Sequence, residues 1–240
     1  MIALIVVHVL LSALYALTMP VFEKLDERSH WYYVHYVREN WDIPDQRTVR
    51  PPRLQWYQPP LYYFIAAALI SPVPSTEYLD PPVNPFYLRF PLTSIPDNMN
   101  LWLHDPDIDG WPWHGDPLAI RLLRFLSIIF SAVAVYFGFR VAHLLFGDDW
   151  LALGAAAWLA LMPGTMNVCT SVANDPLSFA TGTAVLFLSS WGLVRGFNWR
   201  TSAVLGLLAG LALLSKVTTA ATVAAIPLAF LLSPGWSDDR

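Results

Sequence analysis

The sequence has 240 residues, of which 55% are apolar and only 13% are charged. Soluble domains carry about 25% charged residues, so this composition excludes an ordinary soluble domain and indicates an integral membrane protein. The formal net charge of −4 excludes the basic surface of a nucleic-acid-binding protein, and the single cysteine, Cys169, excludes an intrachain disulfide.

The first apolar run, residues 2–21, is long enough to cross a membrane once. A helix needs about 20 apolar residues to span the hydrocarbon core. No basic segment precedes this run and no small-residue cleavage site follows it, so we expect a retained helix and not a cleaved signal peptide. We assign residues 1–21 to this first transmembrane helix.

Residues 22–117 have a different character and are expected to form one long loop outside the bilayer. They hold most of the charged residues, prolines and tryptophans of the chain. Proline pairs interrupt any long helix in this region. Two segments are expected to be helical, residues 28–41 and residues 61–70, and the second is too short to span. We therefore expect it to lie in the membrane interface, with its tyrosines at headgroup level.

Membrane character returns over residues 118–240. Three apolar runs of spanning length come first, at residues 118–146, 150–168 and 177–194. Residues 201–232 then form a longer run with Lys216 near its middle. A single helix of this length would reach roughly 48 Å, well beyond the roughly 30 Å core, so we expect two shorter helices that meet at Lys216. The predicted fold is an all-α membrane protein of about six spans, with the large loop between the first and second.

The short loops predict the orientation of the bundle. The side that shares the N-terminus receives four basic residues: Arg140, His143, Arg195 and Arg200. The short loop on the other side, residues 163–175, contains no lysine or arginine. By the positive-inside rule the N-terminus is cytoplasmic and the large loop is extracytoplasmic. Arg121 and Arg124 argue the other way, but they follow a long loop, for which the rule is weak.

The sharpest chemical signal lies directly after the first span, in the sequence Leu-Asp-Glu-Arg-Ser-His at residues 25–30. It places Asp26 and Glu27 beside Arg28 and His30 at a membrane surface. A carboxylate that faces a cavity can accept a proton from an attacking hydroxyl, and a nearby arginine keeps it ionised. The alternative is an interfacial charge cluster that only ends the helix.

A second signal is Gln-Trp-Tyr-Gln-Pro-Pro-Leu-Tyr-Tyr at residues 55–63. The proline pair forces an extended entry into the following helix, and the aromatic residues can anchor it in the interface. One interpretation is a platform that holds a lipid-linked substrate, with Tyr57, Gln58 and Tyr62 as binding residues. The other is an ordinary interfacial aromatic belt.

Two further ionisable residues are candidates within the second half. Asp175 opens the fourth span, where a carboxylate caps free N–H groups at a helix N-terminus; alternatively, it is a second acidic group in the cavity. Lys216 lies within an apolar run, and an intramembrane ionisable residue is by default a functional hypothesis. It could bind a phosphate just below the headgroups, or its ammonium could simply snorkel to the interface.

Taken in chain order, these motifs resemble the GT-C superfamily of membrane glycosyltransferases, in particular the branch of protein O-mannosyltransferases and lipid A aminoarabinose transferases. The shared features are a first span and a long outer loop that opens with an acidic pair, here Asp26-Glu27. Further shared phrases follow in the same order, at residues 59–63 (PPLYY), 121–124 (RLLR), 174–176 (NDP) and 210–216 (GLALLSK).

The resemblance implies a polyprenyl-phosphate sugar as the donor, with its lipid in the membrane and its sugar in an outer cavity. It implies that Asp26 is the general base of the catalytic pair with Glu27, and that transfer inverts the anomeric carbon. Lys216 and Arg53 would meet the donor phosphate. No cofactor is expected, although Asp26, Glu27 and Asp175 could gather a divalent metal.

Two features depart from the family pattern. Gln58 precedes the proline pair where relatives often carry a lysine or histidine. The chain also ends after about six spans, whereas family members are much longer. We therefore expect an N-terminal module: a fragment, half of a split enzyme, or a shortened relative.

The predicted function is a module that transfers sugar from a polyprenyl-phosphate donor to an acceptor on the extracytoplasmic face, in a bacterial plasma membrane. The alternative is a non-catalytic subunit that binds lipid or partner helices in a larger complex. The expected partners are the lipid-linked donor, membrane lipids and a membrane protein that supplies the missing half, with no nucleic acid.

Overall fold

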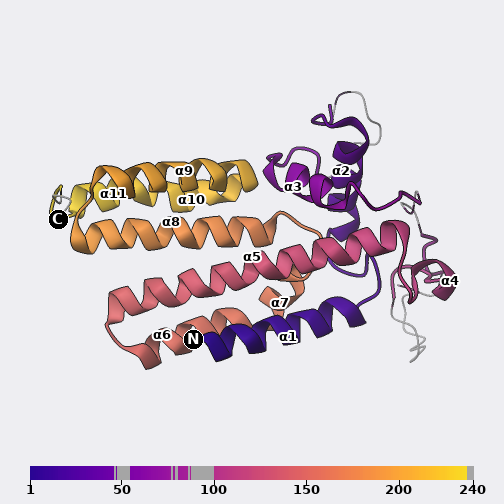
Figure 1. Cartoon of the computed structure of the whole chain (residues 1–240), viewed down its shortest axis with the longest axis horizontal. Coiled ribbons are helices and arrows are strands. Elements are labelled where there is room, and N and C mark those ends of the chain that lie inside the picture. Colours follow the sequence, from indigo (N-terminus) through magenta and orange to yellow (C-terminus); the bar gives the residue numbers. More distant parts are fainter. Residues whose placement is uncertain are drawn as a thin grey trace.

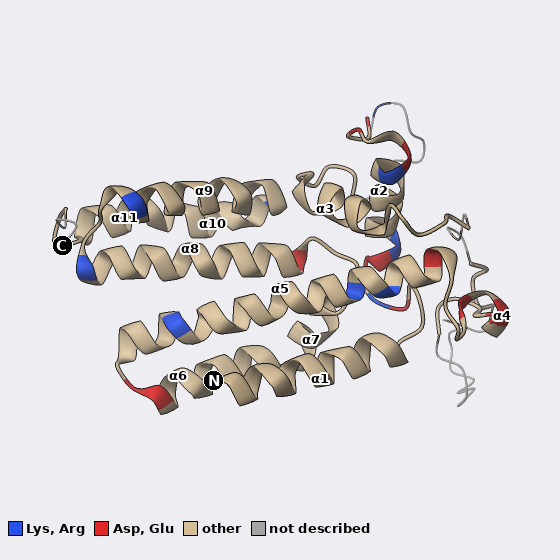
Figure 2. Ribbon diagram, in the orientation of Figure 1, with Lys and Arg blue, Asp and Glu red and all other residues tan. Residues whose placement is uncertain are grey.

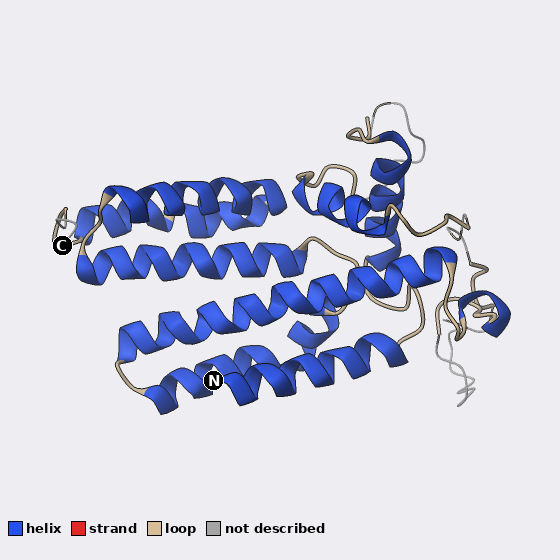
Figure 3. Ribbon diagram, in the orientation of Figure 1, coloured by secondary structure: helices blue, strands red, loops and turns tan. Residues whose placement is uncertain are grey.

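The computed structural model describes residues 1–45, 47, 55–76, 78, 81–85, 87 and 100–236. Within these residues the regular structure is helical, and the only β-type pairings are two isolated bridges (Figure 3). The expected all-α class is confirmed. The helices are α1 (Ile2–Thr18), α2 (Glu27–Asn40), α3 (Leu61–Ile70), α4 (Pro106–Asp109), α5 (Gly115–Phe146), α6 (Asp149–Leu161), α7 (Pro163–Cys169), α8 (Asp175–Arg195), α9 (Trp199–Ser215), η1 (Val217–Thr219), α10 (Ala220–Val223) and α11 (Ala225–Leu232).

Two helices, α5 and α8, are long and apolar enough to cross a membrane, and the bent pair α6 and α7 makes a third candidate. Helices α1 and α9 and the segment 217–232 are apolar but shorter. The protein is thus a helical membrane protein, and the full set of about six spans stays a prediction.

The boundaries of α5 and α6 follow from their capping residues. Helix α5 ends where Gly147 adopts a left-handed conformation (φ 66°) and its N–H donates to the carbonyl of His143. Glycine favours this position because it lacks a Cβ. Asp148 then caps α6, since its carboxylate accepts hydrogen bonds from the N–H groups of Trp150 and Leu151, both at 2.8 Å.

The third apolar run, expected as one span over residues 150–168, is instead two helices bent by 60°. Pro163 occupies the first turn of α7, and Met162 before it is extended. A proline has no N–H to continue the helix and disfavours helical geometry in the residue before it, which accounts for the break. The expected break at Lys216 is confirmed: α9 ends at Ser215, and Lys216 has φ −160° and ψ 138°.

Helix α5 is the central element of the bundle and packs against α1, α6 and α8, while α8 packs against α9 and α11 (Figure 1). His8 ties three of these helices together. Its Nδ1 lies 2.8 Å from the carbonyl oxygen of Ala160 in α6, and its Nε2 lies 2.7 Å from Oγ of Ser131 in α5. At the end away from α2–α4, Gly192 faces the buried ring of Phe197 so closely that a Cβ would overlap it.

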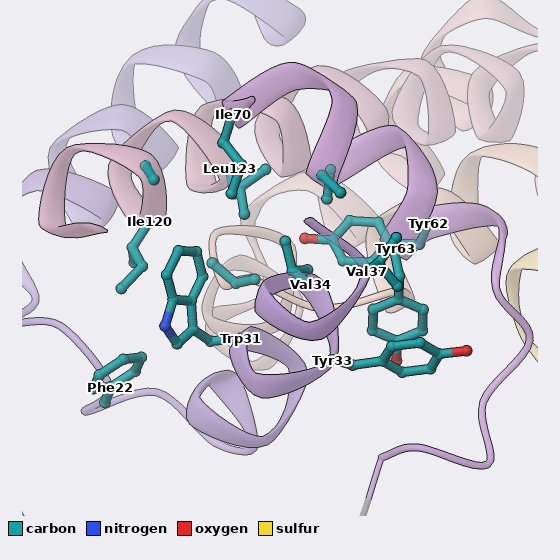
Figure 4. Packing of buried hydrophobic residues seen from close by; sticks show 14 of the residues in the cluster. Phe22, Trp31, Tyr33, Val34, Val37, Tyr62, Tyr63, Ile70, Ile120 and Leu123 are labelled. Atoms are coloured by element: carbon teal, nitrogen blue, oxygen red, sulfur yellow. The ribbon is translucent and has the colours of Figure 1, made fainter. Parts of the chain in front are cut away.

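The described part of the large loop has its own aromatic core (Figure 4). Helices α2 and α3 pack on each other and on the first turns of α5, and Tyr33 stacks on Tyr63 with ring centroids 3.6 Å apart. Tyr62 and Tyr63 are fully buried. These two tyrosines therefore pack inside the protein, because α2 and α5 cover the face of α3 that carries them, and their expected depth at headgroup level stays a prediction.

Candidate functional site

Four segments distant in sequence meet at one end of the bundle. They are the exit from α1, residues 55–58, the α7–α8 connection and the break after α9 (Figure 1). Between them lies a cavity of about 390 Å³, here called the central cavity. Six of the predicted site residues line it: Asp26, His30, Tyr57, Gln58, Asp175 and Lys216.

Asp26 lies at the boundary between the central cavity and a second cavity. It is the N-cap residue of α2, has a left-handed backbone (φ 58°), and makes no capping hydrogen bond with its side chain. Aspartate tolerates this conformation better than most residues. The second cavity, of about 480 Å³, is lined by Asp26 together with Lys24, Arg28, Trp102 and Asn167, among others. The exposed carboxylate of Asp26 is thus available to molecules bound in either cavity.

Glu27 faces the opposite way and lies outside both cavity linings. Its carboxylate forms a two-point ion pair with Arg124, with Nε–Oε1 at 2.7 Å and Nη2–Oε2 at 2.6 Å, and both side chains are fully buried. It also accepts from the N–H groups of Phe22 and Val172. Burial alone would raise the pKa of Glu27, but attraction and hydrogen bonding from Arg124 outweigh it and hold the pKa below its ordinary value. Glu27 therefore joins α2, α5 and the α7–α8 connection.

Arg124 and Arg121 also donate hydrogen bonds to the C-terminal end of α1. Both donate to the carbonyls of Ala16 and Met19, which have no partner within the helix. The sequence offered these arginines only as conflicting evidence on orientation and as part of the family phrase. Their contacts lie about a hundred residues away in the chain, which a local motif does not reveal.

Lys216 reaches the central cavity because the helix breaks at this residue. Its Nζ lies 2.6 Å from Oδ1 of Asp175, at the first turn of α8. Asn174 braces the same junction, since its amide donates to the carbonyl of Ser215 at 2.8 Å and to the side-chain oxygen of Gln58 at 3.3 Å. Gln58 in turn donates to Gln55. Asn174 is buried and was not among the predicted site residues.

His30 supplies a neutral polar group to the central cavity. Its Nδ1 lies 2.8 Å from the hydroxyl of Tyr63. Burial, the largest influence, lowers the pKa of His30 to about 4; Asp175 opposes this shift and Lys216 adds to it. The imidazole is therefore uncharged at neutral pH. It can exchange hydrogen bonds with hydroxyl groups without adding a second cation.

Lys24 lines the second cavity, but it is engaged elsewhere. Its Nζ donates to the carbonyl and the hydroxyl oxygen of Thr170, at 2.6 and 2.5 Å. Burial first, and then repulsion from Arg124, lowers the pKa of Lys24 to about 6. Lys24 is therefore mostly neutral at pH 7, and Lys216 is the better candidate for an anionic ligand.

The remaining predicted residues divide into three cases. Tyr57 is exposed and lines the central cavity, whereas Tyr62 lies in the core beneath it and lines neither of the two cavities. Arg53 lies outside the described residues. No group of three histidine, cysteine, aspartate or glutamate side chains within the described part of the chain could hold a metal ion.

The fold and cavity define a helical membrane protein with a polar chamber at one end of its bundle. Residues 119–238, half of the chain, match the family model described as dolichyl-phosphate-mannose-protein mannosyltransferase. The chain belongs to this family of membrane glycosyltransferases. The match covers Asp175 and Lys216, whereas Asp26 precedes it. No curated protein and no solved structure matches the chain.

Proposed function

We propose that this chain transfers a sugar from a polyprenyl-phosphate donor to an acceptor hydroxyl, with Asp26 as the general base. The observation that carries the proposal is the position of Asp26, whose exposed carboxylate lines both cavities. A general base that deprotonates the acceptor next to the bound donor must contact both binding spaces. Asp26 meets that requirement.

The donor belongs in the central cavity. Lys216 supplies a cation there, and phosphate recognition by lysine is charge-assisted hydrogen bonding. Asp175 holds the Lys216 ammonium by one contact at 2.6 Å, which leaves two further N–H groups for phosphate oxygens. The neutral His30 and the amide of Gln58 line the same space and suit the hydroxyl groups of a sugar.

The acceptor belongs in the second cavity. Its hydroxyl proton passes to the Asp26 carboxylate while its oxygen attacks the anomeric carbon of the donor. The bond from that carbon to the phosphate oxygen breaks, and the electron pair leaves with polyprenyl phosphate beside Lys216. Attack opposite the leaving group inverts the anomeric centre.

Glu27 is proposed as a positioning residue and not as a second base. Its carboxylate is saturated by Arg124 and two backbone N–H groups, all of which favour the ionised form. It fixes the first turn of α2 and thereby places Asp26, the residue before it, at the boundary between the cavities.

The proposal is tested by incubating the purified chain with a panel of polyprenyl-phosphate sugars and detecting released polyprenyl phosphate and glycosylated acceptor. Release that depends on an added acceptor supports transfer. A folded, monodisperse sample that binds donors but turns none over would contradict the proposal. That result would favour the alternative of a subunit that binds lipid-linked sugar within a larger complex.

A further inference from the structure

A separate basic cleft lies at the opposite end of the bundle from Asp26. It has a volume of about 350 Å³ and opens between α5 and α8. Figure 2 shows basic residues on α5 and at the end of α8 on this side of the molecule. The cleft is lined by Arg140, His143, Leu144, Phe187, Trp191 and Arg195, with no carboxylate among them.

The two arginines of this cleft have no carboxylate partner within the described residues. Arg140 donates to the hydroxyl of Tyr136 at 2.7 Å and lies over the ring of Phe187, 4.9 Å from its centroid. Arg195 lies 4.2 Å from the ring centroid of Trp191. Stacking engages the face of a guanidinium and leaves its in-plane N–H groups for an anion.

Among the described residues, the carboxylates near this cleft have other contacts. Asp149, an exposed residue, has its Oδ1 3.2 Å from Nδ1 of His143. Asp148 caps α6. The carboxyl ends of α5 and α8 carry partial negative charge, which Arg195 offsets in the last turn of α8. Arg140 lies more than one turn before the end of α5, beyond the range of that effect.

We propose that this cleft binds the phosphate of an anionic phospholipid headgroup in the leaflet opposite the Asp26 cavities. Helix α8 has 21 residues and is therefore about 31 Å long, which matches the hydrocarbon thickness and places Arg195 at headgroup level. Arginine forks bind phosphate oxygens in pairs. Basic pockets between transmembrane helices are the usual sites for anionic headgroups, and aromatic walls such as Trp191 suit the interface.

A phospholipid fits the cleft better than a small soluble anion does. Leu144 and Phe187 line the same space as the arginines and offer apolar surface to the first part of an acyl chain. A free phosphate would make no use of that surface. The site is independent of the proposed transfer reaction, because none of its lining residues lines the Asp26 cavities.

Native mass spectrometry with phosphatidylglycerol and phosphatidylcholine tests the proposal. We expect preferential retention of phosphatidylglycerol, weakened about five-fold by Arg140→Gln or Arg195→Gln and about 25-fold by both. Arg200→Gln is the matched control, since Arg200 is exposed at the same end and stacks on Trp199 outside the cleft. It should leave retention unchanged.

The proposal would be overturned if the double variant retained phosphatidylglycerol as well as the wild type does. It would also be overturned if Arg200→Gln lost as much retention as the cleft variants do. Displacement of the lipid by millimolar inorganic phosphate would also overturn it, because it would show a small-anion site. A second measurement covers the case in which the variants do not fold. Phosphatidylglycerol should raise the melting temperature of the wild-type protein in detergent more than phosphatidylcholine does, and equal shifts would contradict a headgroup site.

Discussion

Breaking the buried pair between Glu27 and Arg124 by removing one partner should destabilise the protein more than breaking any other ion pair in the described structure. Both side chains are fully buried, and two N–H···O contacts of 2.7 and 2.6 Å join them. Removing one partner of such a pair costs about 3–5 kcal/mol, because the other charge is left buried and unpaired.

We expect Glu27→Gln to lower the free energy of unfolding by about 3 kcal/mol, at the lower end of that range. Arg124 would still donate to the carbonyls of Ala16, Met19 and Pro20, which keeps its charge partly compensated. The assay is denaturant or thermal unfolding of the purified protein in detergent, monitored by tryptophan fluorescence.

Glu39→Gln is the matched control, because Glu39 is a half-exposed glutamate 3.9 Å from Arg38. Surface pairs of this kind contribute about 0–1 kcal/mol, so its effect should be within that range. If Glu27→Gln unfolds like the wild type, the buried pair does not hold the first turn of α2 and the reasoning is refuted.

Three further predictions follow from the site and the bundle. Lys216→Met should raise the KM for the lipid-phosphate donor by about 10-fold to 100-fold, because one charged hydrogen bond contributes about 1.5–3 kcal/mol; steady-state kinetics with an unchanged KM would argue against a phosphate contact. Because the pKa of His30 falls to about 4 in the folded state, the unfolded chain binds this proton first, and stability is lost as pH falls from about 6.5 to about 4. Melting curves of wild type and His30→Gln at pH 7 and 4.5 should differ in this loss by about 2 kcal/mol, and parallel curves would contradict it. Gly192→Ala should destabilise the protein by about 1–3 kcal/mol through overlap with Phe197. Gly210→Ala, which has open space inside α9, should instead stabilise it by about 0.5–1 kcal/mol, so equal melting temperatures of the two variants would contradict the close packing.

The helical class and most helix positions could be predicted from the sequence. The structure agrees with two predicted helices, the apolar run that stops at Gly147 and the short helix over residues 61–70. Both follow from local signals, because a glycine ends the first and the length of the apolar run sets the second. The break at Lys216 also followed from local information, since a continuous helix would place a lysine deep in the membrane.

The internal arrangement of the site could not be predicted in the same way. Asp26 and Glu27 are adjacent and chemically alike, yet one lines two cavities and the other is buried against Arg124. What separates them is the left-handed backbone at Asp26 and a partner 97 residues away in sequence. Likewise, the burial of Tyr62 depends on α2 and α5, which its own segment does not reveal.

The most direct test of the account compares transfer rates of wild type and Asp26→Asn at saturating donor. Loss of a general base lowers turnover by about 10²–10⁴-fold, and we expect a drop in that range with donor binding retained. Asp107→Asn, which removes an exposed carboxylate in α4 outside both cavities, serves as the control and should keep the wild-type rate. If Asp26→Asn transfers sugar as fast as the wild type, Asp26 is not the base and the proposed mechanism is wrong.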